Sequence, residues 1–303
     1  MILNIFIMNK LALICVAVTI SLVVSSCDKN ELGTYTPKMK ITQVYNEVDG
    51  HMLREQWTWD GDLLSKIDYY KKNGNVDYTH TYHYDGNRLV RIDMDNMHTD
   101  FVYDGKRLSG INAYSGDRLL ESYVLSYTGK KLTHISMVRH DKKPAERSLL
   151  SLFMPDAGQS FVAYNGSRND KAESYNFSAA EVDLLWEGNN VEYMRMTLNR
   201  PDSVQHLDVS YLYDENVNVR NPLFTLQIDH QLVNNQPQTL LFSQNNATSV
   251  FVTDKYDVYS RTTSYNYSYD YYKKYPTKVY LITLNHETGE NAENHILSYQ
   301  YMY

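Results

Sequence analysis

The stretch Tyr82–Ile92 (YHYDGNRLVRI) contains the pattern on which the fold depends. Its aromatic residues Tyr82 and Tyr84 share one face of a strand, because side chains alternate along a strand with a period of two. Asp85-Gly86 then supplies a turn, since glycine adopts a positive φ without steric cost and Asp can bond its own backbone. The chain returns with Leu89 and Ile92, which predicts an antiparallel hairpin.

The same pattern occurs five times along the chain. Counted from each glycine, the residue two before it is aromatic, the residue three after it is Leu or Val, and the residue six after it is Ile or Met. The aromatic residues and glycines are Trp59 and Gly61, Tyr84 and Gly86, Tyr103 and Gly105, Tyr127 and Gly129, and Trp186 and Gly188. Such a repeat predicts an all-β protein, an antiparallel meander of hairpins that forms a large curved sheet or an incompletely closed barrel.

The return strand of each repeat contains an irregularity. Leu64 and Ile67, for example, follow Gly61 by three and six residues, and these offsets differ in parity. Both residues cannot face inward on a regular strand. Either the Leu lies at the mouth of the turn, or a β-bulge separates the two residues.

The first 26 residues differ in composition from the rest. Leu11–Val24 is an uncharged, mostly apolar run between Lys10 and Ser25-Ser26-Cys27, which is the order of a secretory signal. Its 14 residues are fewer than the about 20 of a membrane-spanning helix. The end of this segment resembles a bacterial lipobox, which implies a diacylated Cys27 as the first mature residue. The alternative is a plain secretory signal without acylation. Within this segment, Met8 is a more ordinary initiator than Met1, because it lies two residues before the positively charged Lys10.

These features divide the chain into a lipoprotein signal peptide (1–26), a lipidated tether (27–40) and one repeat-built β domain (41–303). The two cysteines are Cys15 and Cys27, so the mature chain forms no disulfide. It carries 28 basic and 36 acidic residues once the signal is removed. This acidic balance argues against nucleic acid as a partner, and against adhesion to an anionic membrane through the domain itself.

The repeats resemble the YD repeats of Rhs-type proteins. Together with the signal they resemble, more closely, a family of uncharacterised Gram-negative lipoproteins whose fold is described as porin-like or as a large curved sheet. Further matching segments are Tyr211–Asp214 with Asn221–Phe224, Leu241–Asn246, and the closing hairpin Tyr275–Tyr303. The resemblance implies a location in the cell envelope, at the outer membrane, and implies no catalytic residues, because the family has no established activity.

The titratable residues give little sign of chemistry. His80 and His83 point to opposite faces of a strand, and His98, His134 and His140 lie further along the chain, so we expect no metal site. Asp60, Asp85, Asp104 and Glu187 occupy the same turn position of their repeats. We interpret them as turn formers rather than as the carboxylate pair of a glycosidase. With no nucleophile elbow, phosphate loop or zinc motif in the sequence, we predict a non-enzyme without a cofactor.

The aromatic residues remain as candidates for binding. The rows that include Trp57, Trp59 and Tyr82 are expected to stack across strands as core, with a sugar-binding surface as the alternative. Tyr69, Tyr70, Tyr271 and Tyr272 are the candidates for an exposed aromatic platform.

The predicted function is a non-catalytic, membrane-anchored lipoprotein that binds or assembles with a glycan or an outer-membrane protein. The alternatives are a surface glycan hydrolase, which requires paired buried carboxylates, and a purely structural envelope protein. A membrane-spanning barrel is not expected, because strands such as Arg88–Asp93 are charged whereas spanning strands carry an apolar outer band.

Overall fold

The computed structural model describes residues 32–47, 50–140, 178–199, 203–222, 242–256, 259–286, 289 and 291–302. These residues form strands of 7 to 14 residues, and sequential strands pair antiparallel. The strands are β1 (Lys40–Asn46), β2 (Met52–Asp60), β3 (Leu63–Tyr70), β4 (Val76–Asp85), β5 (Arg88–Met94), β6 (Met97–Asp104), β7 (Arg107–Ser115), β8 (Arg118–Thr128), β9 (Lys131–Arg139), β10 (Ala179–Glu187), β11 (Asn190–Asn199), β12 (Val204–Val217), β13 (Asn245–Tyr256), β14 (Tyr259–Tyr272), β15 (Tyr275–Asn285) and β16 (Asn291–Met302).

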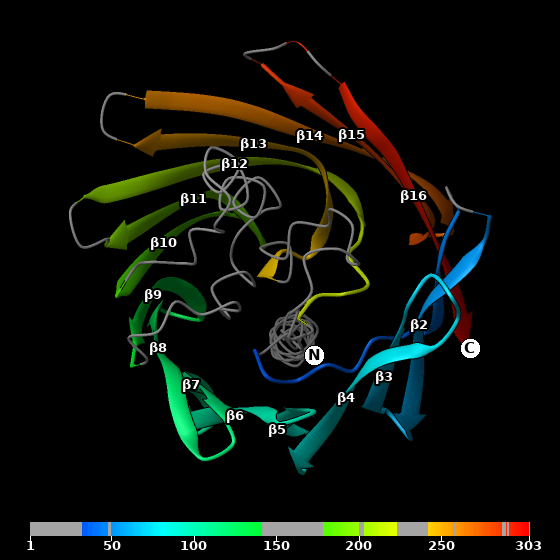
Figure 1. The fold of residues 1–303 in the computed structure, drawn as a ribbon, viewed down its shortest axis with the longest axis horizontal. Coiled ribbons are helices and arrows are strands. Elements are labelled where there is room, and N and C mark those ends of the chain that lie inside the picture. Colours follow the sequence, from blue (N-terminus) through cyan, green and yellow to red (C-terminus); the bar gives the residue numbers. More distant parts are fainter. Residues whose placement is uncertain are drawn as a thin grey trace, which may run out of the picture. The chain divides into compact units, whose positions relative to one another are not determined.

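The strands follow one another around a closed barrel (Figure 1). The predicted antiparallel meander is therefore confirmed. The sequence did not decide whether the sheet closes. The barrel is closed by the pairing of β1 with β16, where Lys40 lies opposite Met302 and Asn46 opposite Leu297. Because each described strand has a neighbour on each side, these strands leave no open sheet edge.

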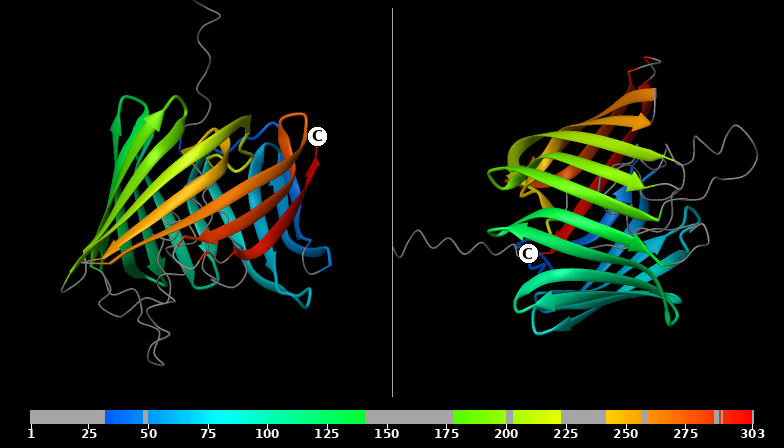
Figure 2. Two further views of the ribbon diagram at one scale, coloured as in Figure 1. Left: turned by 90° about the horizontal axis from the view of Figure 1, so that it is seen from above. Right: turned by 90° about the vertical axis from the view of Figure 1, so that its left-hand side faces the viewer.

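The barrel has two ends, and the strands run obliquely between them (Figure 2). We call one end the turn rim, because the five repeat turns, at Gly61, Gly86, Gly105, Gly129 and Gly188, lie there. β1 starts and β16 ends at this rim as well, since each even-numbered strand runs toward it and each odd-numbered strand runs away from it. The opposite rim carries the connections from odd to even strands, including Gly116-Asp117 between β7 and β8.

Each repeat forms the predicted hairpin, and its irregularity is a bulge. Gly61 has φ of +55° in the two-residue loop between β2 and β3. Trp59 pairs with Leu64 and Thr58 pairs with Lys66, which leaves Ser65 as the extra residue. This bulge lets Leu64 and Ile67 both face inward, and both are fully buried. The same register shift recurs in the other four repeats.

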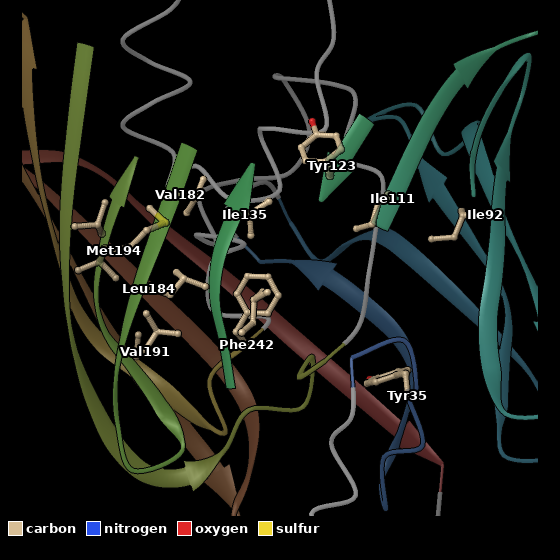
Figure 3. Close-up of a cluster of buried hydrophobic side chains, with 14 of the residues drawn as sticks. Tyr35, Ile92, Ile111, Tyr123, Ile135, Val182, Leu184, Val191, Met194 and Phe242 are labelled. Carbon is tan, nitrogen blue, oxygen red and sulfur yellow. The ribbon is translucent and has the colours of Figure 1, made fainter. Parts of the chain in front are cut away.

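The inner face of the barrel is mostly apolar. Ile67, Ile92, Ile111 and Ile135, the residues six after their repeat glycines, are 0 to 1 % exposed. Figure 3 shows Ile92, Ile111 and Ile135 on the inner side of the sheet with Val182 and Leu184 of β10. These residues belong to one continuous hydrophobic core.

The outer face is polar and charged along the middle of the strands. Lys66, Arg91, Asp183 and Arg195 have side chains that are 41 to 62 % exposed. Several form ion pairs along or across strands, such as Arg195 with Asp208 at 2.7 Å. Apolar residues such as Leu185 and Leu212 also face outward, at 60 and 57 % exposure, but they lie among these charges.

Several sequence predictions fall outside the described residues. These are the signal peptide, Cys27, the part of the predicted loop at 139–147 beyond His140, the strand expected at 149–163 and most of the helix or loop expected at 221–242. The strand expected at 175–186 is β10. No helix in the described ranges has the length and apolar composition needed to cross a membrane.

Candidate functional site

The aromatic residue of each repeat forms a clamp between neighbouring hairpins. Tyr103 on β6 donates a hydrogen bond from its hydroxyl to the backbone carbonyl of Leu89 on β5, at 2.8 Å. Every even-numbered strand has such a donor, and each acceptor lies on the preceding odd-numbered strand, at 2.5 to 2.9 Å. We call these donors the aromatic belt: Trp59, Tyr84, Tyr103, Tyr127, Trp186, Tyr213, Tyr269 and Tyr301.

Basic residues complete the belt in one half of the barrel. Arg88 lies over the ring of Tyr103, 5.3 Å from its centroid, and donates to the carbonyl of Gly105 at 2.9 Å. Lys40, Arg107 and Lys131 make the equivalent pair of contacts with the next hairpin. Burial raises the pKa of Tyr103 to about 12, so its hydroxyl stays a donor. The repeat residues are thus explained by hairpin-to-hairpin contacts.

The acids and histidines that the sequence singled out do not converge. Asp60, Asp85, Asp104 and Glu187 are exposed at the turn rim, and Asp85 pairs with Arg88 at 2.9 Å. His80 is buried on the inner face. His134 lies on the outer face between Glu181 and Asp183. The described part of the chain contains no group of three or more residues suited to a metal ion.

The four tyrosines proposed as an exposed platform lie in different surroundings. Tyr69 faces inward and is 4 % exposed, whereas Tyr272 is 47 % exposed. Tyr70 is half-buried on the outer face and donates to Gln56, and Tyr271 is half-buried and donates to Asp214. β3 and β14 are separated in the ring by β2, β1, β16 and β15. The structure therefore does not bring these residues onto one surface.

A buried ion pair lies among aromatic rings on the inner face. Arg220 donates to both carboxylate oxygens of Glu55, at 3.0 and 2.9 Å, and their side chains are 15 and 6 % exposed. The guanidinium carbon of Arg220 lies 5.3 Å from the ring centroid of Trp57 and 5.8 Å from that of Tyr299. Trp57 also donates its indole N–H to Glu55 at 2.8 Å. We call these residues, together with Tyr69 and Tyr82, the Glu55 cluster.

Arg220 and the tyrosines of the Glu55 cluster have shifted pKa values. Burial, the largest single effect, lowers the pKa of Arg220, but Glu55, Tyr299 and Tyr69 together outweigh it and the pKa is raised overall. Burial also raises the pKa values of Tyr69 and Tyr82 well above the ordinary value. Among the described residues, the hydroxyls of Tyr69 and Tyr82 have no hydrogen-bond partner. Buried polar groups usually have one, so these hydroxyls are the unsatisfied donors of the cluster.

Sequence reasoning missed this cluster. Glu55 and Arg220 are 165 residues apart, and neither belongs to a repeat position. Arg220 precedes Asn221-Pro222, a segment that the sequence analysis noted for its turn alone. A buried arginine has no local signature that separates it from an exposed one.

The buried carboxylates are engaged with donors rather than with one another. Glu121 pairs with Arg139 at 3.0 Å and accepts from Tyr123 at 2.7 Å. Asp254 accepts from Gln205 at 2.8 Å. In the described residues, no hydrogen bond joins two carboxyl groups. These contacts do not provide the two facing carboxyl groups that glycoside hydrolysis requires.

Three comparisons with known proteins found similar solved structures but no similar sequence family. The chain is similar to the crystal structure of a porin-like protein from Bacteroides uniformis, with a TM-score of 0.50 and 11 % identity over 90 % of this chain and 100 % of that one. A porin-like protein from Bacteroides vulgatus gives a TM-score of 0.48 and 10 % identity over 88 % and 99 % of the two chains. No protein-family model and no curated protein matches the sequence. At such low identity, the likeness concerns the fold alone.

Proposed function

We propose that this chain is a non-catalytic lipoprotein of the bacterial cell envelope that binds or assembles with an envelope component, a glycan or a protein. A lipid on Cys27 anchors it, and its barrel stands in water beside the membrane. The observation that carries this proposal is the polarity of the barrel, which is charged on its outer face and apolar on its inner face.

The outward-facing charges make immersion of the barrel in lipid costly. An Arg or Lys at the lipid-facing midplane of a spanning barrel costs about 2–4 kcal/mol. Lys66, Arg91 and Arg195 lie within their strands and point outward, which makes immersion in lipid unfavourable by roughly 6–12 kcal/mol before any acidic residue is counted. A barrel that does not span needs another means of attachment, and the lipobox-like segment before Cys27 supplies it.

The porin-like description of the similar structures belongs to those proteins, and it supports an envelope location for this one. A channel is not proposed, because an open channel has a polar, water-filled interior, whereas the inner face here is apolar and buried.

The Glu55 cluster supports binding over catalysis. Aromatic faces, the hydroxyls of Tyr69 and Tyr82 and the fixed charge of Arg220 are groups that recognise polar rings or peptide side chains. A glycan hydrolase is disfavoured because the repeat acids lie exposed at turns, while the buried carboxylates already bind Arg, Trp, Tyr or Gln side chains.

The anchoring is tested with Cys27→Ala, which removes the acylation site. The wild-type protein is expected in the membrane fraction and Cys27→Ala in the aqueous fraction after cell disruption. A variant that stays in the membrane and resists alkaline extraction would show that the barrel itself is embedded.

The binding role is tested by tryptophan fluorescence of residues 28–303 during titration with a panel of polysaccharides. Because Trp57 contacts Glu55 and Arg220, a ligand at the cluster should change its emission, and Trp57→Phe should remove that change. Trp186→Phe is the matched control, since Trp186 lies across the barrel on β10. No response to any polysaccharide would exclude a glycan at the cluster and leave a protein partner, which crosslinking in intact envelopes would identify.

A further inference from the structure

We propose that the turn rim is the membrane-facing end of the barrel, and that the basic sector formed by its β4–β5, β6–β7 and β8–β9 turns contacts anionic lipid headgroups. This inference rests on the proposed acylation of Cys27. It adds an orientation and a contact surface that the anchor alone does not define.

The first observation is where the chain enters the barrel. Tyr35, in the segment that the sequence analysis assigned to the tether, is 4 % exposed and donates to the carbonyl of Val219 at 2.6 Å. The carbonyl of Gly33 accepts from the backbone N–H of Leu89 at 2.8 Å. A Cβ at Gly33 would overlap the hydroxyl of Tyr103. Residues 33–35 are thus fixed to the barrel beside the aromatic belt, next to the turn rim.

The second observation is the length of chain that remains. Leu32 is five residues after Cys27, and an extended chain spans at most about 3.6 Å per residue, or roughly 18 Å in all. β7 crosses the barrel in 9 residues, which at about 3.3 Å per residue and a typical strand tilt separates the rims by about 20 Å. With the opposite rim toward the membrane, this short segment would have to traverse the whole barrel before reaching lipid. With the turn rim toward the membrane, the distance is easily spanned.

The third observation is the local charge of the rim. Three neighbouring turns carry five basic residues, Arg88, Lys106, Arg107, Lys130 and Lys131, against the acids Asp85 and Asp104. On the opposite rim, the connections between the same strands carry Asp95, Asp117 and Arg118. A Lys or Arg near an anionic bilayer is attracted to its headgroups.

This sector adds to the anchor and does not replace it. The mature chain is acidic overall, which argues against adhesion of the barrel by charge alone. The neighbouring part of the turn rim carries Asp60 and Asp62, and Glu187 lies on the other side of the sector. The barrel should therefore rest on its basic sector, with the acidic parts of the rim held further from the lipid.

The test uses the acylated, full-length mature protein in vesicles that contain an anionic phospholipid and a lipid with a nitroxide headgroup. The sequence has two cysteines, Cys15 in the predicted signal and Cys27 at the proposed acylation site, so one introduced thiol can be labelled with a fluorophore. Lys106→Cys places the label on the basic sector, and Asp117→Cys places a matched label at the other end of β7. Flotation of the vesicles first establishes whether the protein is anchored.

The label at position 106 is expected to be quenched several-fold more than the label at position 117. Equal or reversed quenching in floated protein would overturn the orientation. A third label, Asp62→Cys, is expected to be quenched less than the label at 106, and equal quenching at 62 and 106 would overturn the role of the basic sector. Protein that does not float would instead refute the acylation on which the inference depends, so the two failures are distinguishable.

Discussion

Tyrosine to phenylalanine substitution is predicted to destabilise the protein at Tyr103, in the aromatic belt, but not at Tyr82, in the Glu55 cluster. Tyr103→Phe removes a hydroxyl that donates to the carbonyl of Leu89. Tyr82→Phe removes a hydroxyl on a more deeply buried side chain, and this hydroxyl has no hydrogen-bond partner among the described residues. Both substitutions keep the ring, so each isolates one oxygen atom.

The expected magnitudes follow from the cost of making and losing hydrogen bonds. A typical intramolecular hydrogen bond contributes about 0.5–1.5 kcal/mol to stability, and a buried acceptor left unsatisfied adds to the loss. Tyr103→Phe should lower the free energy of unfolding by about 1 kcal/mol or somewhat more. Tyr82→Phe should be neutral or stabilising, because burying an unpaired hydroxyl costs about 1–3 kcal/mol on the scale of protein mutations.

The assay is equilibrium unfolding in denaturant of residues 28–303 carrying the wild-type residue, Tyr103→Phe or Tyr82→Phe. The change in stability is the shift of the midpoint multiplied by the m-value, which should be the same in all three proteins. Tyr84→Phe combined with Tyr127→Phe should be additive, because these two clamps share neither donor nor acceptor. The reasoning would be refuted by a neutral Tyr103→Phe, or by a Tyr82→Phe that costs as much.

The entry segment, the Glu55–Arg220 pair and the buried tyrosines each give a further prediction. Gly33→Ala should be more destabilising than Gly74→Ala, because both glycines have a φ above +80° but only the Cβ at 33 would overlap a neighbour; thermal unfolding measures both, and equal costs would contradict the docking of the entry segment. Glu55→Gln leaves Arg220 buried without a carboxylate and should lower the free energy of unfolding by about 3–5 kcal/mol. Asp85→Asn, at an exposed pair, should lower it by about 0–1 kcal/mol. Similar losses for the two variants in denaturant unfolding would refute this prediction. Burial raises the pKa values of Tyr35, Tyr84 and Tyr103 in the folded state, so the unfolded chain loses its phenol protons first, from about pH 10. The stability contribution of these tyrosines is therefore fully present below pH 10 and falls as the pH rises above it. An unfolding midpoint that stays constant up to pH 11 would contradict the raised pKa values.

The sequence predicted the hairpins well because the determinants of a hairpin are local. Asp85-Gly86 defines the turn, and the aromatic residues before it define the inward face. The bulge was also foreseeable, because Leu64 and Ile67 differ in parity yet are both large and apolar. Each of these inferences needs fewer than ten consecutive residues.

Closure was not predictable in the same way. It depends on whether β1 pairs with β16, and Lys40 and Met302 are separated by nearly the whole chain. The curvature that brings them together is accumulated over all the strands, with a small contribution from each bulge. The Glu55 cluster was not predictable for a related reason, because Arg220, the partner of Glu55, lies in the connection after β12 and is distant in the sequence. The proposed tyrosine platform shows a further limit, because Tyr69 and Tyr70 are adjacent and a strand sends them to opposite faces.

The abundance of tyrosine has a structural explanation that narrows the search for a binding site. A tyrosine at the belt position packs its ring against the core while its hydroxyl reaches a backbone carbonyl of the previous hairpin, which Phe cannot do and which Trp59 and Trp186 do through their indole N–H groups. The belt residues already donate hydrogen bonds to these carbonyls, so a ligand that bound their donor groups would have to break the contact between hairpins. Tyr69 and Tyr82 make no such hydrogen bond among the described residues, and they lie around the ion pair between Glu55 of β2 and Arg220 in the connection after β12. A ligand-dependent change should therefore be sought first at Trp57, which touches both members of that pair, and a response confined to Trp186 would mean that the belt itself is the binding surface.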